Sequence, residues 1–443
     1  MNVPPGMGTM PNVNDVLMIT SRYGAISPWV DAFEFSTGTG GGEAKMVVTK
    51  HPITTTIRTS RRGWICRGKM VRLDMRRIFD SCNCLAVCST NSPALLVGRN
   101  DRKMKDILCA TEVVLTFAAI CAPCDGERLS RFEFTRPQMG VEFKLVFYAA
   151  NSDVATSAAD ATYARITELN RKLSDYAADS ELNRLCATAG TGQPVRVSDE
   201  LFEVLGRSQA LAARTQGAFD VTVGPFVRLW RRARKSKLLP TERRLARVRP
   251  AVGFQHVRLG FEPKTVELLV PHMRLDLGGI AKGYAADEAL QVLRSRGIDR
   301  ALVDAGGDVV IGDPPPGRKG WRIGIAPLEV DGAPSRYLTL AQSAIATSGD
   351  AFQFVEIGGQ RYSHIVDPRT GLGLTHRQSV TVRARDGTTA DSLATAVSVL
   401  GPVEGLQLIK ATRGASALIV GVVDGNVSEF GAIEIEMQEA AED

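Results

Sequence analysis

The chain lacks most of the cysteine chemistry that would place it in a narrow class. Seven of its eight cysteines lie at or before Cys124, and only Cys186 follows. A folded region with a single thiol needs no internal disulfide, so its cysteine usage fits either redox compartment. The CxxC pair Cys121 and Cys124 has no second pair at zinc spacing and no histidine nearby, which makes it a weak metal signal.

Several common functional fingerprints are absent as well. No GxGxxG motif follows an expected strand, and no GxxxxGK[ST] motif occurs. The usual dinucleotide-binding fingerprint and the P-loop therefore do not apply. GxSxG and HExxH are also missing, so the sequence offers neither a nucleophile elbow nor a zincin helix.

Basic charge is concentrated in the first part of the chain. Net charge is +6, but residues 1–103 hold 14 Lys and Arg against 7 Asp and Glu. The remainder is therefore near neutral and lacks the overall basic footprint of a nucleic-acid-binding protein. One local exception is the segment 228–249, with ten Lys and Arg and one Glu. We interpret it as a solvated helical excursion; the alternative is a membrane or nucleic-acid patch.

The first hundred residues do not look like part of a folded domain. Residues 1–103 show no sustained period of 2 or 3.6 residues. We expect them to be a disordered or irregular extension that is not native, with Met104 as the natural start. Residues 104–124 combine a basic start, an apolar stretch of about ten residues from Val113 and small residues near Cys121, as in a signal peptide. Within this segment, Cys121 is a candidate for lipid attachment. The alternative to a signal peptide is that the segment forms a buried strand or helix.

The folded domain is expected over residues 131–443. Apolar and polar residues alternate from Arg131 onward, which predicts half-buried strands. Amphipathic helices are predicted over residues 153–173, from Ser198 to Gly217 and over 389–400. A further helix is predicted to follow the glycines of the segment 276–289 and to end near residue 295. Because strand pairs outnumber strand–helix–strand units, the sequence favours an α+β fold over a doubly wound sheet.

The segment DLGGIAKGYAADEA, residues 276–289, presents a carboxylate, two glycines, a lysine and then a helix. The turn at Gly278 and Gly279 can expose bare backbone to a phosphate or a metal ion. The following helix points its positive end at the same place. The alternative is a simple strand-to-helix turn with a closely packed glycine.

A second segment, TTADSLATAVSVLG, has helical spacing and ends at Gly401. Asp391 and Thr395 are four residues apart and therefore lie on one helix face. A carboxylate and a hydroxyl on successive turns are hard oxygen ligands that suit Mg²⁺. The alternative is a cap or dipole role for Asp391.

Three further segments carry candidate chemistry. His364 is expected in a strand that ends at a Pro-Arg-Thr-Gly turn, as a proton acceptor or phosphate partner, or as a structural histidine. The segment AIATSGDAF is expected to place residues 347–349 on a turn suited to phosphate. In QGAFDVTVGP, Asp220 is expected to open a strand, and Ala218 and Phe219 are expected to line a flat ring or simply to pack.

Taken together, these segments resemble the FAD:protein FMN transferase (ApbE) family. The resemblance runs from about Arg136 to Gly425. It rests on eight motifs in one order: PQMG, LSDYAADSELNRL, AFDVTVGP, LDLGGIAKGYAADEA, DAGGD, ATSGD, YSHIVDPRTG and ADSLATAV. The family implies an ApbE-like, T-fold-like α+β domain with mixed, mainly antiparallel sheets, packed helices and an active cleft between lobes.

The resemblance also implies an activity and a set of site residues. Family members transfer FMN from FAD to a threonine hydroxyl of a partner protein with Mg²⁺, and release AMP. Catalytic roles fall to His364, which would help to activate the acceptor hydroxyl, and to Asp391. The Mg²⁺ ligands would be the backbone carbonyl of Gly279 with the side chains of Asp391 and Thr395. FAD contacts would come from Met139, Tyr176, Ala218, Phe219, Asp220, Asp276 and Lys282.

Because Gly279 would bind the metal through its backbone carbonyl, the small side chain that relatives carry at this position is expected to be compatible with binding. The acceptor is expected to be a subunit of a membrane redox complex, and no nucleic acid is expected to bind. The location implied is the periplasmic face of the inner membrane, with a possible lipid anchor. Two alternatives stay open: an FAD pyrophosphatase that releases FMN and AMP, and a non-catalytic FAD-binding protein.

Overall fold

The computed structural model describes residues 16–18, 129–325, 328, 336–349 and 353–433 of the chain. Of the upstream region 1–103, only the backbone of β1 (Val16–Met18) is described, and it pairs in parallel with a later strand. The predicted signal-like segment 104–124 and both cysteines of the CxxC pair lie outside the described residues. Cys186 is a buried free thiol, which agrees with a described region that needs no disulfide.

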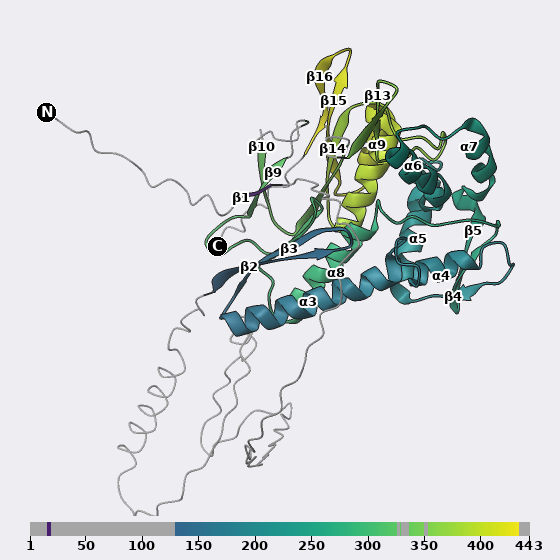
Figure 1. The fold of residues 1–443 in the computed structure, drawn as a ribbon. Helices are drawn as coiled ribbons and strands as arrows, with labels where there is room; N and C mark the ends of the chain where they lie inside the picture. The colour runs from purple at the N-terminus through teal and green to yellow at the C-terminus, as the bar shows by residue number, and fades with distance from the viewer. Residues whose placement is uncertain (1–15, 19–128, 326–327, 329–335, 350–352, 434–443) are drawn as a thin grey trace, which may run out of the picture. The chain divides into compact units, whose positions relative to one another are not determined.

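An eight-stranded sheet forms the centre of the fold, in the order β16-β15-β14-β11-β8-β7-β3-β2 (Figure 1). Every pairing in it is antiparallel. The strands are β2 (Ser130–Gln138), β3 (Val141–Ala149), β7 (Ala301–Ala305), β8 (Val309–Ile311), β11 (Ser343–Gly349), β14 (Gln378–Ala384), β15 (Ser416–Val423) and β16 (Asn426–Ala432). The predicted α+β class is confirmed.

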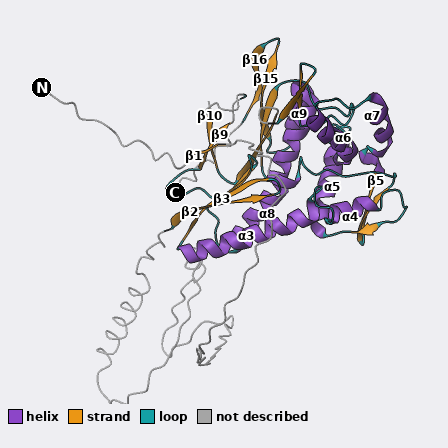
Figure 2. Ribbon diagram, viewed as in Figure 1, coloured by secondary structure: helices purple, strands orange, loops and turns teal. Residues whose placement is uncertain are grey.

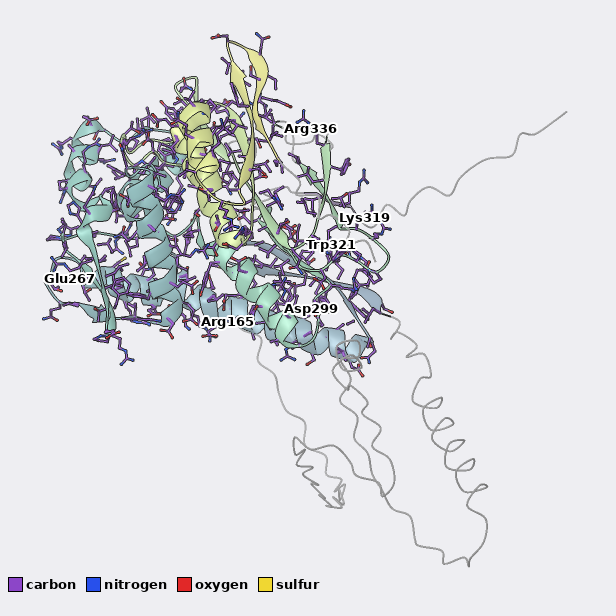
Figure 3. The ribbon with its side chains drawn as sticks, turned by 180° about the vertical axis from the view of Figure 1, so that it is seen from behind. Arg165, Glu267, Asp299, Lys319, Trp321 and Arg336 are labelled. Carbon is purple, nitrogen blue, oxygen red and sulfur yellow. The ribbon has the colours of Figure 1, made fainter. Side chains whose placement is uncertain are left out.

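Alternation along the central strands sends side chains to two different cores. In β3, Leu145 and Phe147 join the large core under the helices, whereas Val146 joins a second core. The second core is covered by β9 (Trp321–Ile325) and β10 (Arg336–Leu340). Because successive strand residues point to opposite faces, both faces of the sheet are buried here. Figure 3 shows Trp321 and Arg336 at this end of the described region, with Glu267 at the opposite end.

Three helices cover the other face of the sheet (Figure 2). They are α3 (Ser152–Leu173), α8 (Ala281–Ser295) and α9 (Gly387–Lys410). α3 lies over β2 and β3, α8 over β7 and β8, and α9 over β11, β14 and β15. By length and composition α9 could cross a membrane, but half of its apolar window is buried against the sheet and α8. A buried core helix explains the same composition.

A smaller group of elements lies beside these layers. The three-stranded sheet β4-β6-β5 consists of β4 (Val195–Arg196), β5 (Val257–Phe261) and β6 (Lys264–Leu268). The helices in this group are α4 (Glu181–Ala187), α5 (Asp199–Arg214), α6 (Gly224–Ser236) and α7 (Glu242–Val248). α6 and α7 share a small core with the hairpin of β12 (Phe354–Ile357) and β13 (Gln360–Ser363). The predicted helical excursion is therefore confirmed, although one side of α6 is anchored by buried Trp230.

Two of three local predictions were wrong. Asp220 does not open a strand but caps the short 3-10 helix Val221–Val223, because its carboxylate accepts from the Thr222 amide. The predicted end of the helix at Gly401 is confirmed: Gly401 is non-helical at φ 77° and ψ −178°, and a second helical stretch follows it to Lys410. Residues 347–349 belong to strand β11 rather than to a turn, since β14 pairs with them. At residues 347–349 a tertiary partner, strand β14, overrides the local turn signal.

Candidate active site at the start of helix α8

Two glycines allow α8 and α9 to approach closely. A Cβ placed on Gly283 would lie 2.1 Å from the carbonyl oxygen of Gly387. Asp287, one turn further along α8, accepts hydrogen bonds from the amides of Gly387 at 2.6 Å and Thr388 at 2.9 Å. The carboxylate thereby caps the first turn of α9 and fixes its register against α8.

This register brings the predicted metal ligands together. The Gly283 amide donates to Asp391 Oδ2 at 3.1 Å, and Gly279 lies directly against the Thr395 side chain. A Cβ on Gly279 would lie 2.7 Å from Thr395 Oγ1, and the Thr395 Cγ2 and Cβ would also be too close. A small side chain at Gly279 would therefore require Thr395 to shift, which the sequence did not predict.

Lys282 supplies the positive charge of the site. Its ammonium is paired with the Asp308 carboxylate and lies 3.6 Å from Asp391 Oδ1. Both carboxylates are almost fully buried. Burial, and next the negative charge of Asp308, raise the pKa of Asp391 to about 7. One cation between two carboxylates leaves a deficit of positive charge, which a divalent cation would remove.

The donors present fit magnesium better than a transition metal. Within the described residues, no three His, Cys, Asp or Glu side chains group as metal ligands. The oxygen atoms at hand are the Asp391 carboxylate, the Thr395 hydroxyl and the Ser348 hydroxyl, whose oxygen is 3.5 Å from that of Thr395. Mg²⁺ prefers such oxygen donors and keeps several waters, so one carboxylate with neutral oxygens is a reasonable set.

A second group of charges surrounds Asp276, at the start of the glycine segment. Arg231 of α6 contacts Asp175 at 2.6 Å and Asp276 at 3.1 Å, and its guanidinium lies 4.1 Å from the centre of the Tyr176 ring. Burial, and next the charge of Asp175, raise the pKa of Asp276 to about 6. The Gly278 amide donates to Asp276 at 2.9 Å, which orients the turn. Tyr176 itself is 78% exposed, so its ring can accept a ligand.

His364 directly follows β13 and is half-buried. Its Nδ1 is 3.3 Å from the carbonyl oxygen of Gln353, so Nδ1 carries the proton and Nε2 is left as an acceptor. Burial, followed by the positive charges of Arg234 and Lys282, lowers the pKa of His364 to about 4. The imidazole is therefore neutral at pH 7, and it lies within electrostatic reach of Lys282.

The remaining predicted contacts lie differently. The side chains of Ala218 and Phe219 are buried in two hydrophobic cores, and the Asp220 carboxylate is engaged by the Thr222 amide and hydroxyl. In this structure their side chains are packed rather than presented to a ligand. Met139, at φ 50°, forms the β2–β3 turn; the adjoining Val141 packs against Gly306 beside the turn that leads to Asp308.

The model of the ApbE family matches residues 139–419. The chain is 32% identical over 327 residues to an FAD:protein FMN transferase of Vibrio cholerae, covering 73% of this chain and 96% of that one. The chain belongs to the ApbE family. An FAD:protein FMN transferase of Treponema pallidum is 35% identical over 257 residues, 55% of this chain and 71% of that protein.

Solved ApbE structures have the same fold. The flavin transferase ApbE from Vibrio cholerae superimposes with a TM-score of 0.62 at 31% identity, over 69% of this chain and 97% of that chain. The ApbE protein from Thermotoga maritima gives a TM-score of 0.62 at 30% identity, over 68% and 97%. The predicted family, fold class and enzyme class are confirmed by these comparisons.

The sequence reasoning missed the partners that hold the ApbE site residues in place. Asp308, the carboxylate that binds Lys282, stood in the DAGGD motif without an assigned role. Neither Arg231, in the basic run, nor Asp175, in a loop, was predicted to belong to the site, although the two form an ion pair. Arg231 is 45 positions from Asp276 in the sequence, so no local pattern could link the two.

Proposed function

We propose that the protein catalyses flavin transfer, moving FMN from FAD to a threonine hydroxyl of an acceptor protein and releasing AMP. Its family and its relatives named FAD:protein FMN transferase support the transfer of a flavin nucleotide. The use of Mg²⁺, the threonine acceptor and the AMP product are finer points of the proposal. They rest on the chemistry of the residues around α8.

The observation that carries the proposal is the contact between the glycine turn and one face of α9. Gly279 against Thr395, and Gly283 against Asp391, join two segments more than a hundred residues apart in the sequence. Mg²⁺ would be held by Asp391, Thr395 and the Gly279 carbonyl, where it would neutralise charge on the FAD pyrophosphate. Lys282, in the first turn of α8, adds a fixed cation at the positive end of the helix.

The reaction forms one P–O bond and breaks another. The threonine oxygen attacks the phosphorus of the FMN half, and the pyrophosphate bond to AMP breaks, with AMP leaving as the anion. His364 Nε2 accepts the hydroxyl proton, because Nδ1 is already the donor to Gln353. General-base help of this kind contributes roughly 10²–10⁴-fold. With a pKa of about 4 the imidazole is a weak base, and the negative charge of bound pyrophosphate would strengthen it.

One assay tests the reaction. The protein is incubated with FAD, Mg²⁺ and an acceptor containing threonine, and the products are separated under denaturing conditions. A fluorescent acceptor band that survives denaturation is expected, together with one AMP per flavin transferred. FMN and AMP without the band would identify an FAD pyrophosphatase, and stable FAD without products would identify a binding protein.

We also propose that the enzyme works outside the cytoplasm, on a subunit of a membrane redox complex. The signal-like layout of residues 104–124 supports an exported protein, and Cys121 is the candidate for a lipid anchor. Fractionation of native cells, with mass spectrometry of the mature N-terminus, tests this. A cytoplasmic protein that retains residues 1–103 would contradict both the location and the start at Met104.

A further inference from the structure

A groove runs beside α6, and its lining residues Leu229 and Val248 also pack against the small core around Trp230. Its larger part has a volume of about 460 Å³ and lies between α4, α6 and the segment before Asp276. A second hollow of about 240 Å³ continues along α7 and shares Pro225, Val248 and His272 with the first. Because they share walls, the two hollows form one elongated groove, which we call the arginine groove.

The charge on its walls is of one sign. Four arginines line the two hollows, and neither lining contains an aspartate or glutamate: Arg228, Arg232, Arg247 and Arg274. None of the four forms an ion pair with a carboxylate of the described residues. Arg228 has a lowered pKa, chiefly because the charge of Arg274 is near, then through burial and the charges of Arg232 and Arg231. The charge of Asp175 offsets this only in part, so the cations lie close together with little compensation.

The walls also have an apolar part. Ala187, Leu229, Val248 and Met273 contribute carbon surface between the arginines. A lone phosphate or a flat lipid headgroup layer would leave this surface and the length of the groove unused. An extended peptide with acidic and apolar side chains would cover both, since charged partners are matched at interfaces and apolar side chains fill their pockets.

The arginine groove adjoins the candidate active site. Arg274 is 3.5 Å from Asn183, and Asn183 holds the loop of Tyr176 through the carbonyl oxygens of Asp175 and Ala177. Arg228 and Arg231 lie one turn apart on α6, the first facing the groove and the second paired with Asp276. A chain bound in the groove would therefore lie next to the loop that carries a candidate FAD contact.

We propose that the arginine groove binds an acidic, partly apolar segment of the acceptor protein and so presents the threonine to the flavin site. This rests on the proposed transfer to a protein. A transferase with a protein substrate needs a surface beyond the reacting atoms, because binding at a distance positions the reacting group. The acceptor itself is specified only by its chemistry: Asp or Glu with an apolar side chain, near the target threonine.

The test uses the full chain and two labelled, unstructured peptides that contain threonine. One is rich in Glu and Leu, and its twin has every Glu replaced by Gln. The groove variant is Arg228→Gln/Arg232→Gln. The matched control is Arg243→Gln/Arg244→Gln, which removes the same charge from exposed residues of α7 outside the groove. Binding is measured by fluorescence anisotropy without FAD or Mg²⁺.

The acidic peptide is expected to bind the wild type and the control alike, and the groove variant about tenfold more weakly. Added salt should weaken this binding through screening. In the transfer assay the groove variant should raise KM for the acidic peptide by a similar factor at unchanged kcat. The proposal would be overturned if the wild type bound the Gln peptide as tightly as the acidic peptide. It would also be overturned if the groove variant and the control variant lost the same affinity for the acidic peptide.

Two further probes separate other anions from the peptide. Inorganic phosphate and phosphatidylglycerol vesicles are expected to bind the wild type and the groove variant equally. Arginine-dependent binding of either, with no binding of the acidic peptide, would overturn the proposal in favour of that anion. Peptide binding without any transfer would instead contradict the proposed function alone, because the anisotropy measurement does not depend on the reaction.

Discussion

The α8–α9 site and the arginine groove differ in how their charged side chains are paired. Around α8 the buried carboxylates Asp308 and Asp391 flank the ammonium of Lys282. In the groove, Arg228 and Arg232 are exposed and have no carboxylate partner among the described residues. The first region therefore holds two carboxylates to one ammonium, whereas the linings of the groove hold arginines and no aspartate or glutamate.

The difference follows from desolvation. A buried charge without a partner is too costly to keep, so the inner site must be nearly balanced before any ligand arrives. An exposed arginine is hydrated, so it can remain unpaired until an anionic partner binds. On the functions proposed here, the inner site would accept one small cation with a pyrophosphate, and the groove an extended anion.

Asp391→Asn should reduce flavin transfer by about a thousandfold, because the loss of a metal ligand removes several kcal/mol of charge stabilisation. The amide oxygen can still accept from the Gly283 amide, so the fold should remain. Transfer rate, Mg²⁺ titration and thermal unfolding measure the three consequences. Transfer at the wild-type rate in this variant would refute the metal assignment.

His364→Gln should reduce transfer by roughly 10²–10⁴-fold, as expected for the loss of a general base, while FAD binding is retained. His376→Gln is the matched control, since His376 also contacts a main-chain carbonyl oxygen, that of Ser398. Single-turnover transfer with prebound FAD gives the chemical step. Equal effects of the two substitutions would point to a structural role for His364.

The titration of His364 sharpens the same point. Its folded pKa of about 4 lies below the ordinary histidine value of 6.5, so the folded protein holds fewer protons on this side chain than the unfolded chain does between pH 4 and 6.5. Its contribution to stability is therefore present above pH 6.5 and is lost as the pH falls towards 4. An NMR titration of the ring protons, assigned with His364→Gln, should give a midpoint near 4. A midpoint near 6.5 would show a solvated ring.

Gly279→Ala should weaken Mg²⁺ binding by about tenfold, because the new methyl group pushes Thr395 away at an overpacking cost of about 1–3 kcal/mol. Gly206→Ala on α5 is the control, since nothing lies within 4 Å of its Cβ position. Calorimetric Mg²⁺ titration in the presence of FAD measures the effect. Unchanged affinity would mean that Thr395 is not a ligand.

Arg231→Gln should change FAD affinity only a few-fold. The guanidinium stacks on an exposed ring, and such contacts contribute roughly 0.5–1 kcal/mol. Loss of its positive charge should also raise the pKa of Asp276 further above its ordinary value. Fluorescence titration of FAD, with Arg243→Gln as control, measures the affinity. A loss of a hundredfold or more would make Arg231 a principal FAD contact.

Much of the fold could be predicted from local pattern. The caps at Asn151 and Ser198 and the alternation in β2 and β3 act within a few residues, so the predicted helices and strands formed there. The turn predicted at residues 347–349 failed because pairing with the distant strand β14 outweighed the local signal. The candidate site divides in the same way: motif order gave Asp391, Thr395 and His364, but not the partners that hold them.

The sequence by itself determined the family, the α+β class and the identity of most candidate site residues, because these depend on residue types at short spacing. Only the tertiary structure decided that Thr395 fills the space at Gly279, that Asp308 holds Lys282, and that arginines of α6, α7 and the segment before Asp276 line one groove. The physical reason is distance along the chain. Charge balance and close packing depend on side chains that come into contact only in the folded protein, so a local sequence pattern cannot predict them.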